Sequence, residues 1–167
     1  NKETRPLRDM VKESIFNLIE NSNKFDVNIK NSNILDLFSG CGSFGLECLS
    51  RGVKKVTFVE NNHEAFLILK KNISFLNIEE KCDLLEQNCF DFIKNHSGNK
   101  FNLIFLDPPF KEKKINELLN RIFELKLLKK KGIIIMHRHK KDDLLFTEKL
   151  KIIDKRFYGI SKIIFEN

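Results

Sequence analysis

Residues 34–45 read ILDLFSGCGSFG, an apolar run that leads into three closely spaced glycines. The apolar half predicts a buried strand over residues 34–38, and the residues after the turn predict a helix from Ser43 to Arg51 that Gly52 ends. The glycines fit the pattern G-x-G-x-x-G, which permits unusual backbone angles and the close approach of a ligand. They are Gly40, Gly42 and Gly45. A glycine turn between a strand and a helix favours a sheet that binds an adenosine-containing cofactor.

Outward from this turn, the chain alternates between predicted strands and helices. We expect further strands over residues 55–60, 82–87, 101–107 and 132–137, and helices over residues 7–21, 62–77, 90–95, 115–127 and 142–146. Residues 149–157 and 159–165 predict a closing antiparallel hairpin. This alternation predicts an α/β fold, with a Rossmann-like, mostly parallel sheet and helices on both faces. With 167 residues, one domain spanning residues 1–167 is expected.

The composition is that of a soluble globular protein, with 41% hydrophobic and 32% charged residues. No apolar run reaches the roughly 20 residues that a membrane span needs, so no membrane partner is expected. The net charge of +7 favours a polyanionic partner such as RNA or DNA, although a lysine-rich soluble protein would also carry it. The four cysteines lack the spacing of a zinc site, so we expect free thiols, no metal and a cytoplasmic location.

Polar residues after the first three predicted strands indicate which cofactor the turn holds. Glu60 ends the second strand, at about the spacing expected for a carboxylate that binds ribose hydroxyls. Asp36 lies inside the first strand, where a nicotinamide-binding fingerprint normally has an apolar residue. A carboxylate there would repel a pyrophosphate but suits a ligand that carries an ammonium and a sulfonium. Asn88, after the third strand, is placed to hydrogen-bond an adenine edge, or is a simple turn residue. These features favour S-adenosylmethionine over a nicotinamide cofactor.

A second motif, Asp107-Pro108-Pro109-Phe110, directly follows the apolar run of residues 101–106. A carboxylate at the mouth of a buried strand is costly unless it has a partner. Two prolines cannot continue a strand or begin a regular helix, so they predict a rigid loop. The carboxylate, backbone carbonyls without competing amide donors, and an aromatic face together form a clamp. It suits a planar base with an exocyclic amino group, on which Phe110 would stack rather than join the core.

Both motifs resemble a known family. Residues 36–47 resemble motif I of the class I S-adenosylmethionine-dependent methyltransferases, and residues 107–110 resemble their motif IV of the (Asp/Asn)-Pro-Pro-(Phe/Tyr) type. Thr4-Arg5-Pro6, Arg8-Asp9, Tyr158-Gly159 and residues 13–17, 49–52 and 58–60 resemble the RsmD-type 16S rRNA guanine-N2 methyltransferases. The resemblance implies a seven-stranded sheet with the cofactor over the carboxyl ends of its first strands. The chain departs from the family pattern at Met136-His137-Arg138-His139, where many relatives carry an acidic residue.

The resemblance implies methyl transfer from S-adenosylmethionine to the exocyclic N2 amine of a guanine in 16S rRNA, free or in an assembling small subunit. Asp107 would accept one amino hydrogen and the Pro108 carbonyl the other. Residues 1–22 would cover the cofactor and RNA side of a monomer. The expected cofactor residues are Asp36, Phe38, Ser39, Gly40, Gly42, Gly45, Glu60, Asn61, Asn88 and Cys89. The expected catalytic residues are Asp107, Pro108, Pro109 and Phe110, and the expected RNA-binding residues are Arg5, Arg8 and Phe110.

Three other functions fit parts of the sequence. A DNA amino-methyltransferase of the adenine-N6 type would use a similar clamp, but 167 residues leave little room for a target-recognition region. A nicotinamide-dependent oxidoreductase accounts for the glycine turn and leaves the clamp unexplained. A non-catalytic RNA-binding module of the same fold would not need every residue of the clamp.

Overall fold

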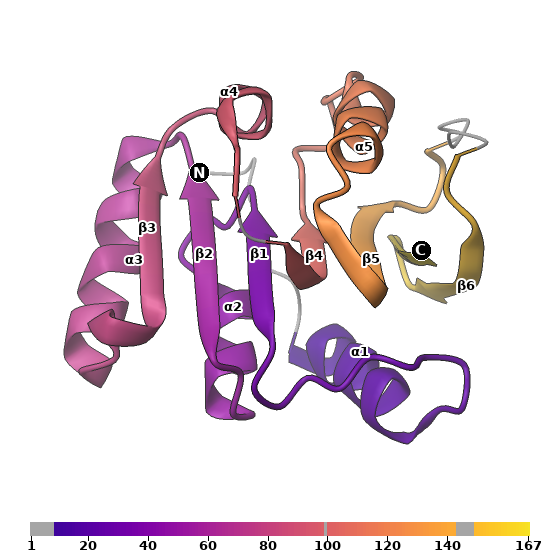
Figure 1. The fold of residues 1–167 in the computed structure, drawn as a ribbon, viewed down its shortest axis with the longest axis horizontal. Helices are drawn as coiled ribbons and strands as arrows, with labels where there is room; N and C mark the ends of the chain where they lie inside the picture. Colours follow the sequence, from indigo (N-terminus) through magenta and orange to yellow (C-terminus); the bar gives the residue numbers. More distant parts are fainter. Residues whose placement is uncertain (1–8, 99, 143–148) are drawn as a thin grey trace.

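The computed structural model describes residues 9–98, 100–142 and 149–167. Helices and strands alternate through most of this part of the chain (Figure 1). The helices are α1 (Asp9–Asn21), α2 (Ser43–Ser50), α3 (His63–Leu76), α4 (Cys89–Asn95) and α5 (Ile115–Glu124), with a 3₁₀ turn at Glu79–Lys81. The strands are β1 (Asn33–Leu37), β2 (Lys55–Glu60), β3 (Cys82–Glu86), β4 (Phe101–Leu106), β5 (Leu128–His139), β6 (Ile152–Tyr158) and β7 (Ser161–Glu166).

The strands form one seven-stranded sheet in the order β3-β2-β1-β4-β5-β7-β6. The first five strands are parallel, and β7 pairs antiparallel with both β5 and β6. The chain therefore builds outward from β1 to β3, and then returns to the other side of β1 to add β4 and β5. Ligands bind open α/β sheets at such a reversal of strand order, above the carboxyl ends of the strands. The predicted α/β sheet and its closing hairpin are confirmed.

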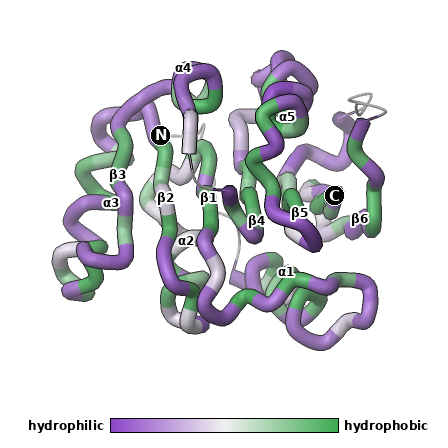
Figure 2. Tube along the Cα trace, viewed as in Figure 1, coloured by the Kyte–Doolittle hydropathy of each residue, from purple (hydrophilic) through white to green (hydrophobic). Residues whose placement is uncertain are grey.

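Helices cover both faces of the sheet, because the buried strands present apolar side chains on both sides. Hydrophobic residues run along the central strands β1, β4 and β5, as Figure 2 shows. One core packs α1, α2 and α3 against the sheet, and it contains a row of stacked rings, Phe16, Phe44 and Phe105. A second core packs α4 and α5 against the other face. Among the helices that the structure describes, none has the length and apolar character needed to cross a membrane.

The structure corrects the boundary between the fifth helix and the fifth strand. We predicted a helix over residues 115–127 and a strand over residues 132–137, whereas α5 ends at Glu124 and β5 begins at Leu128. Leu127 is buried and matches the helical pattern. Its carbonyl, however, accepts a hydrogen bond from the Phe101 backbone N–H at 2.8 Å, so Leu127 already pairs with the start of β4. The strand then bulges between Leu128 and Ile133, where Lys131 has a φ of +66°.

Two predictions involve residues outside the described part of the chain. The first is the helix over residues 142–146, of which only Asp142 is described. The second concerns the region of residues 1–22, described only from Asp9 onward. Within it, α1 packs on the same face as α2, and Ser14 and Tyr158 share a hydrogen bond of 2.5 Å between their hydroxyl oxygens. That this region covers the cofactor and RNA side stays a prediction.

Candidate active site

The glycine turn follows β1 and combines two different requirements. Gly45 is required by packing, because a Cβ atom there would lie 2.3 Å from the Phe58 ring. Gly42 has a φ of +86°, which favours glycine, and a Cβ atom there would lie 2.4 Å from a methyl carbon of Leu69. Gly40 differs, because a Cβ there would meet no atom within 4 Å, while its φ of +55° disfavours any side chain. Its backbone therefore borders open space at the end of β1, where a ligand can approach closely.

Two buried carboxylates brace this turn. Asp36 is 1% exposed, and its Oδ2 accepts a hydrogen bond from the Gly45 backbone N–H at 3.0 Å. Glu60 is 7% exposed and accepts from the backbone N–H groups of Gly40 and Asn62, each at 2.7 Å. An ionised carboxylate offers about four lone-pair positions, so Glu60 keeps capacity for ribose hydroxyls. Its role as a ribose ligand stays a prediction.

The site concentrates negative charge within a basic protein. Burial raises the pKa of Asp36 well above its usual value, against a lowering by the Gly45 hydrogen bond, and the nearby charges of Asp107 and Glu60 raise it further. Asp36 lies in β1, Glu60 ends β2 and Asp107 follows β4. These three strands are neighbours in the sheet, so the carboxylates gather at its carboxyl end. A cationic ligand in this position would relieve their mutual repulsion. This electrostatic pattern fits a sulfonium and an ammonium better than a pyrophosphate.

The other predicted cofactor residues surround the same strand ends. Ser39 has a buried hydroxyl that finds no hydrogen-bond partner among the described residues, which suits a site that a ligand completes. The Cys89 thiol accepts a hydrogen bond from the Phe38 backbone N–H at 3.3 Å, and burial raises its pKa to about 12, so it is an inert structural thiol. Phe38 itself has a φ of +58°, a strained conformation for a non-glycine residue. Asn61 is exposed directly after β2.

Asn88 serves as the N-cap of α4. Its side-chain oxygen accepts a hydrogen bond from the Phe90 backbone N–H at 2.8 Å, as an N-terminal cap does. The side-chain oxygen of Asn88 therefore has a local structural role, which is the alternative of a turn residue. The side-chain NH₂ group is exposed and has no partner within the described ranges, so it can still donate to an adenine edge.

The Asp-Pro-Pro-Phe loop follows β4 on the other side of β1. The Asp107 backbone N–H donates to the Leu37 carbonyl at 3.4 Å, which ties the start of the loop to β1. In the part of the chain that the structure describes, neither Asp107 Oδ2 nor the Pro108 carbonyl oxygen has a hydrogen-bond partner. Phe110 is 47% exposed and therefore lies outside both cores. A carboxylate oxygen, a carbonyl oxygen and an open ring thus stay available for a base.

Sequence reasoning missed the side chains that hold this loop. Arg138 is 2% exposed, and its guanidinium donates to the carbonyl oxygens of Pro109 at 3.1 Å, Phe110 at 3.3 Å and Glu112 at 3.2 Å. The same group forms an ion pair with Asp142. The planar fork of arginine donors can bind several acceptors at once. Arg138 therefore ties the clamp loop to the end of β5.

The two histidines beside Arg138 also lie at the clamp. His137 is 6% exposed, and its Nδ1 lies 2.7 Å from Asp107 Oδ1. Its Nε2 lies 2.8 Å from the Ser161 hydroxyl. The rings of His137 and His139 contact Phe110 edge-on, with centroids 5.8 and 5.3 Å apart. The departure from the family pattern at residues 136–139 thus supplies contacts to both the carboxylate and the aromatic residue.

Strand register explains this arrangement. Leu106 in β4 pairs with Met136 in β5, so Asp107 and His137 occupy the next, adjacent positions. The available signal was an apolar strand that ends in three consecutive basic or imidazole side chains. It was uninformative alone, because only the parallel pairing of β4 with β5 brings it to the clamp.

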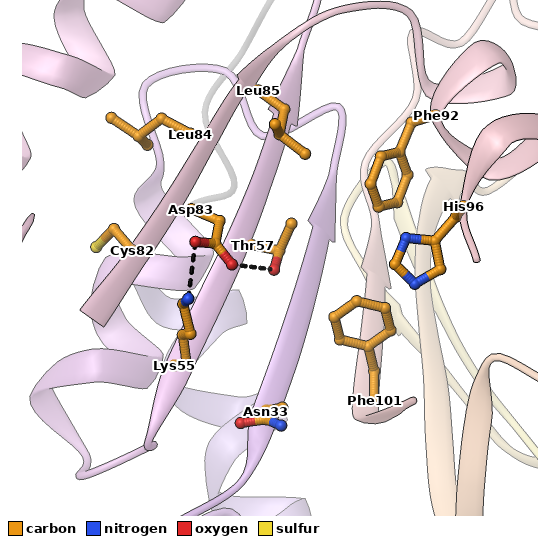
Figure 3. A pocket seen from close by; sticks show the side chains of 10 residues that line it. All are labelled: Asn33, Lys55, Thr57, Cys82, Asp83, Leu84, Leu85, Phe92, His96 and Phe101. Carbon is orange, nitrogen blue, oxygen red and sulfur yellow. Dashed lines mark hydrogen bonds and ion pairs between the residues drawn. The ribbon is translucent and has the colours of Figure 1, made fainter. Parts of the chain in front are cut away.

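The remaining predicted residues and a cavity between β3 and α4 lie elsewhere. Arg5 and Arg8 are outside the described residues. A cavity of about 390 Å³ lies near the amino ends of β1, β2 and β4, lined by β3 and by rings from α4 (Figure 3). There, Lys55 forms an ion pair with Asp83 at 2.8 Å. Because ligands of such sheets bind at the carboxyl ends, this cavity is separate from the candidate active site.

The strand order of the sheet, the glycine turn after β1 and the clamp after β4 are those of a class I methyltransferase. The chain belongs to the family described as conserved hypothetical protein 95, whose model matches residues 1–167. The family resemblance that the motifs predicted is confirmed.

Sequence relatives agree with this assignment. The chain is 34% identical over 158 residues to the ribosomal RNA small subunit methyltransferase D of Haemophilus influenzae, covering 93% of this chain and 79% of the relative. It is 30% identical over 152 residues to the protein of the same name from Buchnera aphidicola, covering 91% and 76%.

Solved structures share the fold. The Haemophilus influenzae protein HI0767 has a TM-score of 0.79 and 32% identity, with 95% of this chain and 96% of that chain covered. A conserved hypothetical protein of Streptococcus pyogenes has a TM-score of 0.80 and 28% identity, with 93% and 94% covered. The protein SMU.776, solved with S-adenosylhomocysteine, has a TM-score of 0.72 at 16% identity, with 94% and 48% covered, and supports the fold alone.

Proposed function

We propose that this protein transfers a methyl group from S-adenosylmethionine to the exocyclic N2 amine of a guanine in small-subunit ribosomal RNA. The observation that carries the proposal is the braced clamp beside the glycine turn, where neither Asp107 Oδ2 nor the Pro108 carbonyl oxygen has a hydrogen-bond partner among the described residues. The relatives named small subunit methyltransferase D support the RNA substrate. A ribosomal RNA substrate also implies a cytoplasmic location.

The residues at the ends of β1, β2 and β3 fit the cofactor. Glu60 would hold the ribose, Asn88 the adenine edge, and the open backbone at Gly40 with the orphaned Ser39 hydroxyl would line the remainder. The carboxylate of Asp36 would offset the positive charge of the ligand. When bound, S-adenosylmethionine supplies an electrophilic methyl group on a sulfonium.

The clamp residues would perform the chemistry on the base. An exocyclic amine is a poor nucleophile because its lone pair is delocalised into the ring. Asp107 would accept one amino hydrogen and the Pro108 carbonyl the other, which directs the nitrogen lone pair toward the methyl carbon. Positive charge develops on that nitrogen in the transition state, and a preorganised carboxylate stabilises it. Asp107, or water, then takes the proton that the methylated amine releases. Phe110 would stack on the base.

Two basic runs meet around this clamp and support an RNA partner. Lys111, Lys113 and Lys114 follow Phe110, while Lys140 and Lys141 follow the end of β5, and all five are exposed. The bonds from Arg138 to the loop hold the two runs next to each other. A third run, over residues 126–131, lies at the opposite end of β5. Lysines around a stacking platform suit the phosphates of a base that has been turned out of its helix or loop.

The test is tritiated methyl transfer to naked 16S rRNA, to assembled small subunits and to DNA. Asp107→Ala should abolish transfer while S-adenosylmethionine binds as in the parent protein, because Asp107 lies on the acceptor side of the site. The matched control is Asp91→Ala, which removes an exposed carboxylate of α4. Mass mapping of the product identifies the methylated atom. Wild-type turnover by Asp107→Ala would refute the clamp mechanism. Methylation of DNA alone would favour the adenine-N6 alternative, and nicotinamide turnover would favour the oxidoreductase.

A further inference from the structure

His137 differs from the other residues of the site because it is almost fully buried and yet bonds to the carboxylate expected to bind the amino group of the substrate. Its side chain is 7% exposed, whereas the side chain of Asp107 is 26% exposed. A line of polar groups thus leads from Ser161 in β7, through the imidazole, to a carboxylate that substrate can reach. Burial of such a chain is costly unless each member is satisfied.

The partners of the ring decide where its proton lies. An ionised carboxylate accepts hydrogen bonds and cannot donate them, so Nδ1 must carry the proton that bonds to Asp107 Oδ1. In the neutral ring Nε2 is then an acceptor, and the Ser161 hydroxyl donates to it across 2.8 Å. Asp107 is therefore the residue that selects the tautomer, and the Ser161 hydroxyl, which can donate or accept, satisfies the other ring nitrogen.

We propose that His137 is a positioning residue for methyl transfer: with its Nδ1 proton bonded to Asp107 and its Nε2 held by Ser161, it fixes Asp107 Oδ1 and leaves Oδ2 aimed at the amino group. This inference rests on the proposed function. Without the bond, the carboxylate can rotate about its side-chain torsions and offer its oxygens in many orientations. Since alignment of the reacting groups supplies a large part of the rate, this freedom lowers turnover more than binding.

The kinetic test compares His137 with His139, the other histidine that contacts Phe110. His137→Leu removes the bonds to Asp107 and Ser161 together with the edge contact to Phe110. His139→Leu removes the other edge contact to Phe110 and the bond that the Lys141 backbone N–H donates to Nδ1, but no bond to Asp107. We expect His137→Leu to lower kcat about 30-fold, with KM for RNA and the Kd for S-adenosylmethionine within about twofold of the parent. In His139→Leu the effect should fall on KM for RNA. His137→Asn places an amide donor where Nδ1 lies, and it should restore kcat to within about fivefold of the parent.

A spectroscopic test is independent of activity. With ¹⁵N-labelled histidine, the parent protein should show one buried imidazole with its proton on Nδ1, and Ser161→Ala should alter that signal. A buried ring without a proton on Nδ1 would overturn the proposal even if the protein methylates RNA. Parent-like kcat in His137→Leu, or equal kcat losses in the leucine variants of both histidines, would overturn it as well. If the parent protein transfers no methyl group, the proposed function is wrong. The tautomer result still tests the hydrogen bonds from Ser161 through His137 to Asp107, because it does not depend on activity.

Discussion

Replacing Arg138 by methionine should lower both the stability of the protein and the rate of methyl transfer, and the two effects can be measured separately. The change keeps an unbranched side-chain stem, but it removes three bonds to loop carbonyls and leaves Asp142 without its ion-pair partner. Breaking a buried ion pair costs about 3–5 kcal/mol. The side chain of Asp142 is 18% exposed and can regain water, so we expect the lower end, about 3 kcal/mol. In a chain of this size that lowers Tm by about 6–12 °C.

The effect on methyl transfer should exceed what stability explains. With the carbonyls of Pro109 and Phe110 released, the clamp loop can shift, and a displacement of about 1 Å in a reacting group can cost about 100-fold in rate. Urea unfolding measures the first quantity, and methyl transfer at a temperature where the variant is fully folded measures the second. Arg138→Lys keeps the charge next to Asp142 but lacks the planar fork, so it should recover more stability than turnover.

A second arginine provides the control. The Arg156 side chain is 43% exposed and pairs with Asp154 at 3.0 Å in β6, and Asp154 also pairs with Lys24. Arg156→Met should therefore change stability by less than about 1 kcal/mol and leave turnover unaltered. If Arg138→Met unfolds and methylates like the parent protein, the loop is held by something other than this guanidinium, and the reasoning about the clamp is wrong.

Three further predictions concern other parts of the molecule. Glu166 is fully buried without hydrogen-bond partners in the described chain, and burial raises its pKa to about 7 from an ordinary 4.5, so stability should fall as pH rises through this interval. Glu166→Gln should therefore gain about 3 kcal/mol over the parent in urea unfolding at pH 8 and nothing below about pH 4.5, and an equal gain at both pH values would contradict this account. Gly45→Ala places a methyl group 2.3 Å from the Phe58 ring and should cost about 1–3 kcal/mol in thermal unfolding, despite the better helix propensity of alanine; unchanged stability would show that the core yields there. Phe110→Ala should raise KM for RNA about tenfold at unchanged S-adenosylmethionine affinity, and an unchanged KM would exclude stacking.

Local patterns predicted most of the fold. The strand over residues 55–60 was predicted with the bounds that the structure has, because an apolar run between a glycine turn and an N-capping asparagine leaves little ambiguity. The predicted boundary near Leu127 was wrong because the burial of Leu127 is compatible with both the buried face of a helix and a strand of the sheet. The bulge that follows is rich in lysine, so the start of β5 does not look like a strand in the sequence.

The candidate site was predictable only in its sequence-local parts. The glycine turn and the Asp-Pro-Pro-Phe loop are contiguous in the chain, and each limits the backbone by its own residue types. The support of the loop is not local, because Arg138 lies 28 residues beyond Phe110 and meets it only through strand pairing. The predicted cofactor role of Glu60 did not reveal that its carboxylate also closes the turn onto β2.

The position of β1 beside β4 has a consequence for how the methyl donor and the acceptor are aligned. The groups expected to hold the methyl donor belong to β1, β2 and the segment after β3, while those expected to hold the acceptor belong to β4 and β5. The seam between these halves is a pair of neighbouring strands, joined from Ile34 and Leu103 to Leu37 and Leu106 and spaced about 4.8 Å apart like strands in any sheet. Donor and acceptor are thus aligned by main-chain pairing, and the stacking of Phe44 in α2 on Phe105 in β4 couples the packing of the two halves.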